Sequence, residues 1–134
     1  NIMTDNGICL LHTIGTVNSP GPTQPFIQKR IFPGGIIPSL SDLISPIEKT
    51  GLILADCETL IHHYDKTLKA WLDRFLKNKE KAKFLYNKEF VRMWEFYLAS
   101  CSAAFKFRDL VVYQLQLVKS FTALPSNRRN YIYQ

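Results

Sequence analysis

The feature that most constrains this chain is an apolar run of strand length near its beginning. Residues 7–14 read GICLLHTI, a nearly unbroken apolar run that His12 interrupts close to its end. Successive residues of a strand point to opposite faces of a sheet, so such a run predicts a strand that is buried on both faces, as in a parallel sheet. A strand of this kind needs a neighbour on each side. We therefore expect part of the sheet to come from residues outside this sequence.

Two further strands are predicted. Residues 51–56 form a second apolar run, and residues 110–118 alternate between apolar and polar side chains. The region between the first two strands begins with residues 15–35, which are rich in Gly and Pro and predict a long loop of the kind that often carries function. The tail, residues 125–134, is expected to be peripheral.

Helical spacing of apolar residues predicts helices over residues 59–78 and 88–105. A shorter helix should open near Leu40, and Pro46 should end or kink it because proline lacks the backbone N–H that a helix interior needs. Three strands combined with helices indicate an α/β layered domain. We find neither a repeat nor a domain boundary within residues 1–134.

The composition excludes intrinsic disorder and a repetitive fibrous chain, because 46% of the 134 residues are apolar and only 6 Gly and 7 Pro occur. We expect neither a bilayer-spanning run of about 18 apolar residues nor a secretory leader. The first residue is Asn, which fits a trimmed chain or a piece of a longer one. Cys9, Cys57 and Cys101 are widely spaced and have no ligand cluster around them, so we predict buried thiols in a reducing compartment and no metal site.

The net charge of +6 is concentrated in the second half of the chain. Residues 65–95 hold nine Lys and Arg against five Asp and Glu, and the run at 77–83 is the densest part. Such a run of charged residues most often forms a solvated loop between two helices. The alternative is a surface that is attracted to an anionic membrane. Nucleic acid is not expected as a partner, because no helix-turn-helix, RNP or zinc-finger pattern accompanies the charge.

Five short segments occur in an order that is specific in combination, although each alone is a weak signal. They are LHTIG at 11–15, IFPGG at 31–35, IPSL at 37–40, HYDKTL at 63–68 followed by Trp71, and RMW at 92–94 followed by YL at 97–98 and Cys101. In this combination nearly the whole chain resembles the C-terminal part of cyclopropane-fatty-acyl-phospholipid synthases. Mycolic acid cyclopropane synthases and related S-adenosylmethionine (SAM) methyltransferases belong to the same family.

The resemblance implies a class I, Rossmann-like methyltransferase sheet, in which the last three strands lie at one edge and the final strand is inserted antiparallel. The strands predicted at 7–14, 51–56 and 110–118 match those three. The chain, residues 1–134, would then be a single incomplete domain, the C-terminal part of a catalytic domain. No glycine-rich loop with GxGxxG spacing occurs in it. The SAM site is therefore expected outside this chain, with no cofactor-binding residues inside it.

The family reaction transfers a methyl group from SAM to the cis double bond of an acyl chain, after which a base removes a proton and the ring closes. A bound bicarbonate is proposed as that base in the family, and such an anion must be held by hydrogen-bond donors. The resemblance implies that His12 donates its ring N–H to bicarbonate, Ile14 its backbone N–H and Tyr64 its hydroxyl. Without the resemblance, His12 would be bonded to nearby backbone and Tyr64 would be a core aromatic residue.

A second group of residues matches the positions that line the acyl-chain tunnel of the family. These residues are Phe32, Leu68, Tyr97, Cys101 and Phe105. The last three follow one another at four-residue spacing and so share one helix face. Ordinary core packing is the competing explanation for such a stripe.

The sequence thus predicts the C-terminal part of a SAM-dependent methyltransferase that acts on the double bonds of unsaturated phospholipid acyl chains, in the cytoplasm at the inner membrane surface. The chain alone is expected to be inactive. Two alternatives remain: a stand-alone lipid-binding or interaction module from a split gene, and a family member that makes methyl-branched or hydroxylated acyl chains. The open sheet edge also predicts self-association.

Overall fold

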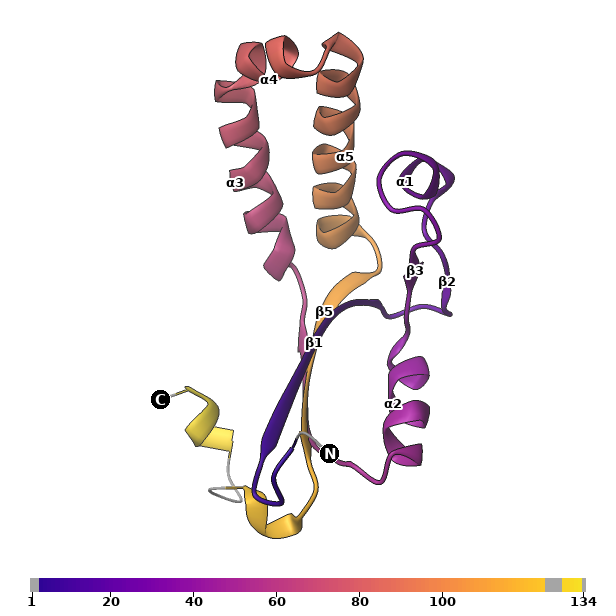
Figure 1. The fold of residues 1–134 in the computed structure, drawn as a ribbon, viewed down its shortest axis with the longest axis vertical. Helices are drawn as coiled ribbons and strands as arrows, with labels where there is room; N and C mark the ends of the chain where they lie inside the picture. Colours follow the sequence, from indigo (N-terminus) through magenta and orange to yellow (C-terminus); the bar gives the residue numbers. More distant parts are fainter. Residues whose placement is uncertain (1–2, 125–128, 134) are drawn as a thin grey trace.

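The computed structural model describes residues 3–124 and 129–133. The molecule is elongated, with a sheet at one end and a helical hairpin at the other (Figure 1). The sheet contains β1 (Ile8–Thr16), β4 (Ile53–Leu60) and β5 (Leu110–Val118). Their order is β1-β5-β4, and β5 is antiparallel to both neighbours. The strand that comes last in the sequence is therefore central, which confirms the predicted α/β fold with an inserted antiparallel strand.

The burial of the strands differs from the prediction. The strand that is buried on both faces is β5, where Val111 and Val112 point to opposite faces and are 3% and 0% exposed. In β1, Ile8 and Leu10 are 44% and 61% exposed. The expectation that β1 is buried on both faces is wrong for the described residues, because β1 is an edge strand and only one of its faces is covered.

The covered face packs on α2 (Leu40–Lys49). Ser39 caps this helix, since its side chain accepts from the backbone N–H of Asp42 and its backbone N–H donates to the Asp42 carboxylate. Of the two predicted effects of Pro46, the end of the helix does not occur, because α2 continues to Lys49. Pro46 and Asp42 are both exposed, so water can bond to the Asp42 carbonyl that loses its helical partner. The core of this layer consists of Ile47 with Val111, Tyr113, Leu115 and Leu117.

The helical hairpin contains α3 (His63–Lys77), α4 (Lys79–Leu85) and α5 (Lys88–Phe107). The charged run predicted as an inter-helix loop is helical for most of its length, because it forms α4. The predicted start of the first long helix at residue 59 is wrong, since β4 continues to Leu60. At the junction His62 has a left-handed backbone (φ 59°), and its Nδ1 atom lies 3.3 Å from the carbonyl oxygen of Phe105.

The region predicted as one long loop contains short elements of its own. These are β2 (Gly21–Pro22), α1 (Pro25–Arg30) and β3 (Ile36–Ile37), with β2 and β3 paired antiparallel. Two 3-10 helices, η1 (Phe121–Ala123) and η2 (Arg129–Tyr133), follow the last strand.

The described part of the tail is peripheral, as predicted, since Arg129, Asn130 and Tyr133 are exposed, but it is also bound to the sheet; residues 125–128 and 134 lie outside the described residues. Arg129 forms a two-pronged ion pair with Asp56 of β4, with distances of 2.6 Å and 2.9 Å. Two tyrosine hydroxyls complete the attachment, Tyr131 to Gln116 at 2.7 Å and Tyr133 to Glu58 at 3.1 Å. The tail thus lies on the sheet face opposite α2 (Figure 1).

Within residues 3–124 and 129–133, no helix combines the length and the apolar character that crossing a bilayer requires.

Candidate functional site

His12 lies on the face of β1 that points away from α2. It is paired in register with Gln114 of β5, which is paired on its other side with Glu58 of β4. The Nδ1 atom of His12 lies 3.1 Å from Nε2 of Gln114. An amide nitrogen can only donate, so Nδ1 accepts here and the neutral ring carries its proton on Nε2. His12 is exposed and can therefore offer an Nε2–H donor to a ligand.

Ile14 follows on the same face, and its backbone N–H points to the free edge of β1. The N–H of Thr16 donates outward to the carbonyl of Pro38 at 2.9 Å, whereas the N–H of Val17 donates to the carbonyl of Asp109 at 3.0 Å. Backbone N–H groups point to alternate edges along a strand. The N–H of Ile14 has the same direction as that of Thr16, away from β5, and is available to a ligand.

The end of β1 is held by a close contact between Gly15 and the ring of Tyr113. A Cβ atom at position 15 would lie 2.3 Å from Cε2 of Tyr113, so only glycine fits under this ring. The Tyr113 hydroxyl donates to the carbonyl oxygen of Thr16 at 2.9 Å. The Thr16 hydroxyl in turn donates to the Asp109 carboxylate at 3.2 Å. These contacts hold in place the part of β1 that carries His12 and Ile14.

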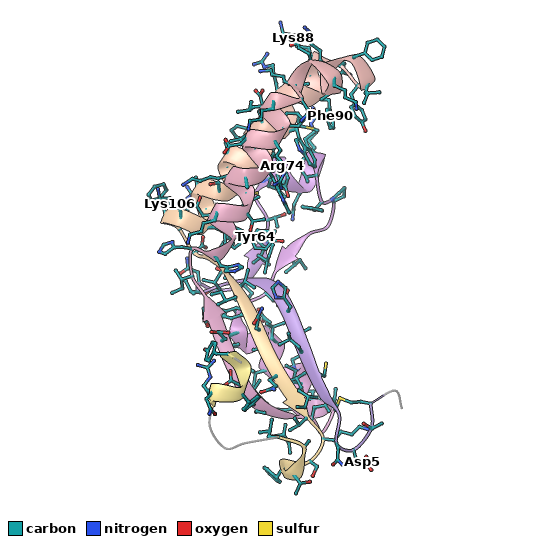
Figure 2. All side chains as sticks on the ribbon, turned by 90° about the vertical axis from the view of Figure 1, so that its left-hand side faces the viewer. Asp5, Tyr64, Arg74, Lys88, Phe90 and Lys106 are labelled. Carbon is teal, nitrogen blue, oxygen red and sulfur yellow. The ribbon has the colours of Figure 1, made fainter. Side chains whose placement is uncertain are left out.

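Tyr64 lies where the helical hairpin meets the sheet (Figure 2). Its ring stacks on Phe105 with centroids 5.3 Å apart and meets Trp71 edge to face at 6.0 Å. It packs against the buried cluster that includes Val112 of β5, and Val112 is paired in register with Ile14. The structure thus places His12, Ile14 and Tyr64 around one part of the sheet. Among the described residues, no hydrogen bond links any two of these three.

The five residues predicted for the acyl chain gather in the same region. Leu68 and Phe105 are buried members of the cluster that contains Val112, and Tyr97 and Cys101 pack against it. Phe32 is 55% exposed and reaches Tyr97 edge to face, with centroids 6.2 Å apart. Burial raises the pKa of the Cys101 thiol to about 11 and also raises the pKa of Tyr97. The surroundings are therefore poorly solvated, as both an acyl-chain site and a packed core require.

A buried polar bridge fixes α3 against α5 beside these residues. The hydroxyl of Ser102 donates to Oδ1 of Asp65 at 2.5 Å, and Lys69 lies 3.2 Å from Oδ2 of the same carboxylate. Asp65 and Ser102 are only 7% and 8% exposed. The Ser102 hydrogen bond is the main cause that lowers the pKa of Asp65, with Lys69 adding to it against desolvation. The bridge holds Tyr64 and Cys101, the sequence neighbours of its two ends.

Sequence reasoning missed Gln114, Gly15, Tyr113 and the bridge between Asp65 and Ser102. One of them had a usable signal: Gln114 and Gln116 alternate with apolar residues in this strand, and a polar side chain within a sheet needs a hydrogen-bond partner. Among the described residues, no three His, Cys, Asp or Glu side chains form a group that could hold a metal ion.

Comparisons with known proteins agree on one family. The family model for mycolic acid cyclopropane synthetase matches residues 1–115. Tuberculostearic acid methyltransferase of Mycobacterium tuberculosis is 41% identical over 99 residues, which are 72% of this chain and 23% of that protein. Cyclopropane-fatty-acyl-phospholipid synthase of Escherichia coli is 37% identical over 109 residues, which are 81% of this chain and 28% of that protein.

Among solved structures, mycolic acid cyclopropane synthase CmaA1 complexed with SAH and CTAB matches with a TM-score of 0.73 and 28% identity, over 83% of this chain and 44% of that chain. The chain spans about a quarter of the length of the two curated relatives. The match over residues 1–115, together with the strand order and the order of the sequence segments, shows that this chain belongs to the mycolic acid cyclopropane synthetase family.

Proposed function

We propose that the chain is the C-terminal part of the catalytic domain of a SAM-dependent methyltransferase that modifies the double bonds of unsaturated phospholipid acyl chains. The observation that carries the proposal is the placement of His12 and Ile14 on one face of β1, next to the Val112 cluster that holds Tyr64 and the candidate acyl-chain residues. The protein named as a cyclopropane-fatty-acyl-phospholipid synthase, to which the chain is 37% identical, supports this substrate.

SAM supplies the methyl group when it is bound, and its site belongs to the part of the enzyme that precedes these strands. The relative crystallised with SAH, which is SAM without the transferred methyl, supports this cofactor. The residues of this chain do not offer a glycine-rich cradle for it. We expect the isolated chain to show no saturable SAM binding in calorimetry and no turnover.

Bicarbonate fits the donors that the chain does present. The ring Nε2–H of His12 and the outward N–H of Ile14 are both donors without an acceptor among the described residues, and the Tyr64 hydroxyl supplies a third. Hydrogen-bond donors of this kind are what a bound anion requires. Bound there, bicarbonate would supply the base for the reaction. His12, Ile14 and Tyr64 would hold it and keep its accepting oxygen oriented.

The location of this reaction follows from its substrate. An enzyme of this kind works in the cytoplasm at the inner surface of the membrane, where phospholipid acyl chains are present. The net charge of +6 favours such a surface, because anionic headgroups attract basic proteins.

The test uses the full-length parent enzyme with single substitutions. His12→Ala and Tyr64→Phe should each lower turnover by roughly 10² to 10³, the effect of losing one donor to a bound anion, and leave SAM affinity within a few-fold. Tyr64→Phe keeps the ring that stacks on Phe105 and should need more bicarbonate to reach half its maximal rate. Tyr133→Phe removes a hydroxyl from an exposed ring of the tail, outside the site, and should behave as wild type. Unchanged turnover and bicarbonate dependence in Tyr64→Phe would show that Tyr64 is only a core residue.

One observation favours a second candidate product, a methyl-branched acyl chain. The relative that is 41% identical is a tuberculostearic acid methyltransferase, and its name denotes a methyl-branched product. Analysis of the modified acyl chains by NMR separates the two, since cyclopropane protons resonate at much higher field than those of a methyl branch.

A further inference from the structure

The far end of the helical hairpin, residues 76–90, is a distinct surface that we call the hairpin tip. It includes the end of α3, all of α4 and the start of α5. Figure 2 shows Lys88 at the end of the molecule most distant from Asp5, beyond Tyr64 and well away from the sheet. The tip is therefore separate from the donors around β1 that the proposed function uses.

The tip exposes large apolar side chains that a water-soluble surface does not need. Phe84, Leu85 and Tyr86 are consecutive and are 87%, 62% and 64% exposed, and Leu76 near the end of α3 is 45% exposed. An open hollow of about 380 Å³ adjoins Leu85 and Tyr86, and its full lining is Phe75, Asn78, Lys81, Ala82, Leu85, Tyr86 and Phe90. A contiguous apolar patch of this kind marks an interaction surface.

Positive charge surrounds this apolar patch. The tip, residues 76–90, contains five lysines and two acidic residues, Glu80 and Glu89. Lys79 is paired with Glu95 at 2.6 Å and Lys83 with Glu80 at 3.5 Å. Across residues 3–124 and 129–133 the other three lysines of the run form no salt bridge. They are Lys77, Lys81 and Lys88.

We infer that the hairpin tip docks on an anionic phospholipid surface, with Phe84, Leu85 and Tyr86 entering the interface and the lysines binding headgroups. The choice of a lipid partner rests on the proposed function, and the side chains of the hairpin tip are suited to a lipid surface. Aromatic and aliphatic side chains flanked by lysines are the composition of interfacial anchors. Tyrosine is favoured at the depth of the headgroups, and each lysine near such a surface contributes about fivefold in binding.

The tip is connected to the candidate acyl-chain residues by one face of α5. Ring centroids are 4.3 Å apart from Tyr86 to Phe90, 5.8 Å from Phe90 to Trp94 and 5.1 Å from Trp94 to Tyr97. These neighbouring rings, two pairs stacked and the last pair tilted, form an apolar row from the docking surface to Tyr97, which packs on the Val112 cluster. Docking at the tip would therefore bring the apolar face of α5 against the lipid that carries the substrate chain.

The experiment is co-sedimentation of the 134-residue chain with vesicles of phosphatidylcholine, with and without about 30% phosphatidylglycerol. Binding should require phosphatidylglycerol and weaken with added salt. Phe84→Ser should lower the partition coefficient about tenfold or more, and the double substitution Lys77→Glu with Lys81→Glu should lower it further. Two matched controls lie far from the tip, Phe121→Ser, where the ring is 84% exposed, and Lys49→Glu at the end of α2; both should bind as wild type.

Equal binding to vesicles without phosphatidylglycerol, or equal losses in Phe84→Ser and Phe121→Ser, would overturn the inference. So would a Phe84→Ser variant that binds vesicles normally but no longer self-associates, because the tip would then contact a second copy. Vesicle binding needs neither SAM nor turnover, so its failure is distinct from failure of the proposed function. In the full-length enzyme, Phe84→Ser should lower turnover on vesicles and leave turnover on detergent-dispersed substrate unchanged.

Discussion

The Nε2 atom of Gln114 lies 3.1 Å from Nδ1 of His12, across two strands that are 102 residues apart in sequence. Gln114→Leu should therefore remove the group that keeps the His12 proton on Nε2. The loss of one such hydrogen bond is worth about 0.5–1.5 kcal/mol, a two- to tenfold fall in turnover of the full-length enzyme.

The tautomer of His12 can also be measured directly in the 134-residue chain by long-range ¹H–¹⁵N NMR. Gln114→Glu is the matched variant, since a carboxylate only accepts and should move the His12 proton to Nδ1. Identical His12 ring spectra in wild type and Gln114→Glu would show that Gln114 does not orient the ring.

Gly15→Ala should destabilise the chain by about 1–3 kcal/mol, because the added methyl overlaps the ring of Tyr113 and forces a backbone shift. Urea denaturation measures the change. Gly21→Ala is the control, since nothing lies within 4 Å of a Cβ built there, and it should be nearly neutral. Equal midpoints for the two variants would contradict the close contact at the end of β1.

Ser102→Ala should make stability less dependent on acid pH. The pKa of Asp65 is lowered in the folded chain, mainly by Ser102, so the associated stability is present above the ordinary value of 3.8 and is lost as the pH falls through the folded value. The stability difference between wild type and Ser102→Ala should be largest near neutral pH and shrink below about pH 4. Denaturation series at several pH values would reveal it, and a difference that does not change with pH would argue against the bridge.

Alkylation by iodoacetamide should distinguish the three thiols. The prediction of buried thiols is wrong for Cys9, which is exposed and should react first. Partial burial of Cys101 limits access and holds its pKa at about 11. Because the thiolate is the reactive form, labelling of Cys101 should keep rising with pH up to about 11. Peptide mass spectrometry gives each rate, and a Cys101 rate that levels off near pH 9 would disagree with a buried thiol.

The exposed edge of β1 should promote self-association of the isolated chain. Leu10 is 61% exposed on this edge strand, and an unprotected apolar edge pairs readily with another copy. Sedimentation velocity should show a dimer or larger species, and Leu10→Lys should shift it toward monomer. A clean monomer with strong amide protection over residues 8–14 would count against this expectation.

Local patterns predicted those elements whose boundaries depend on local chemistry. The strand at 110–118 was placed correctly from its alternation, and the helix at 88–105 falls short by only two residues. Burial was harder, because whether a strand is covered depends on its neighbours: the apolar run in β1 is at an edge, and the alternating β5 is in the centre. Pro46 does not end its helix, since an exposed proline in a helix costs less when water can reach the carbonyl that it leaves unpaired.

In the candidate site too, local sequence patterns predicted some residues, whereas contacts between distant positions were not predicted. His12, Tyr64 and the acyl-chain residues follow from short sequence segments. The residues that orient them come from distant positions, as with Ser102 and Asp65, 37 residues apart. The attachment of the tail to the sheet was not predicted, because no local signal connects Arg129 to Asp56, 73 residues away. Such pairs exist only once the sheet order brings their elements together.

The central place of β5 has a consequence for how this chain is made. β1 and β4 do not pair with each other, so neither has a sheet partner among the described residues until residues 110–118 emerge from the ribosome. Gln114 is synthesised 102 residues after His12, and this synthesis takes roughly 5–20 s at ordinary elongation rates. During that interval β1 and β4 have no sheet partner among the described residues, and folding dominated by such distant pairings is slow and prone to aggregation. A chain truncated before Leu110 would lose β5, the strand that joins β1 to β4 within the described residues.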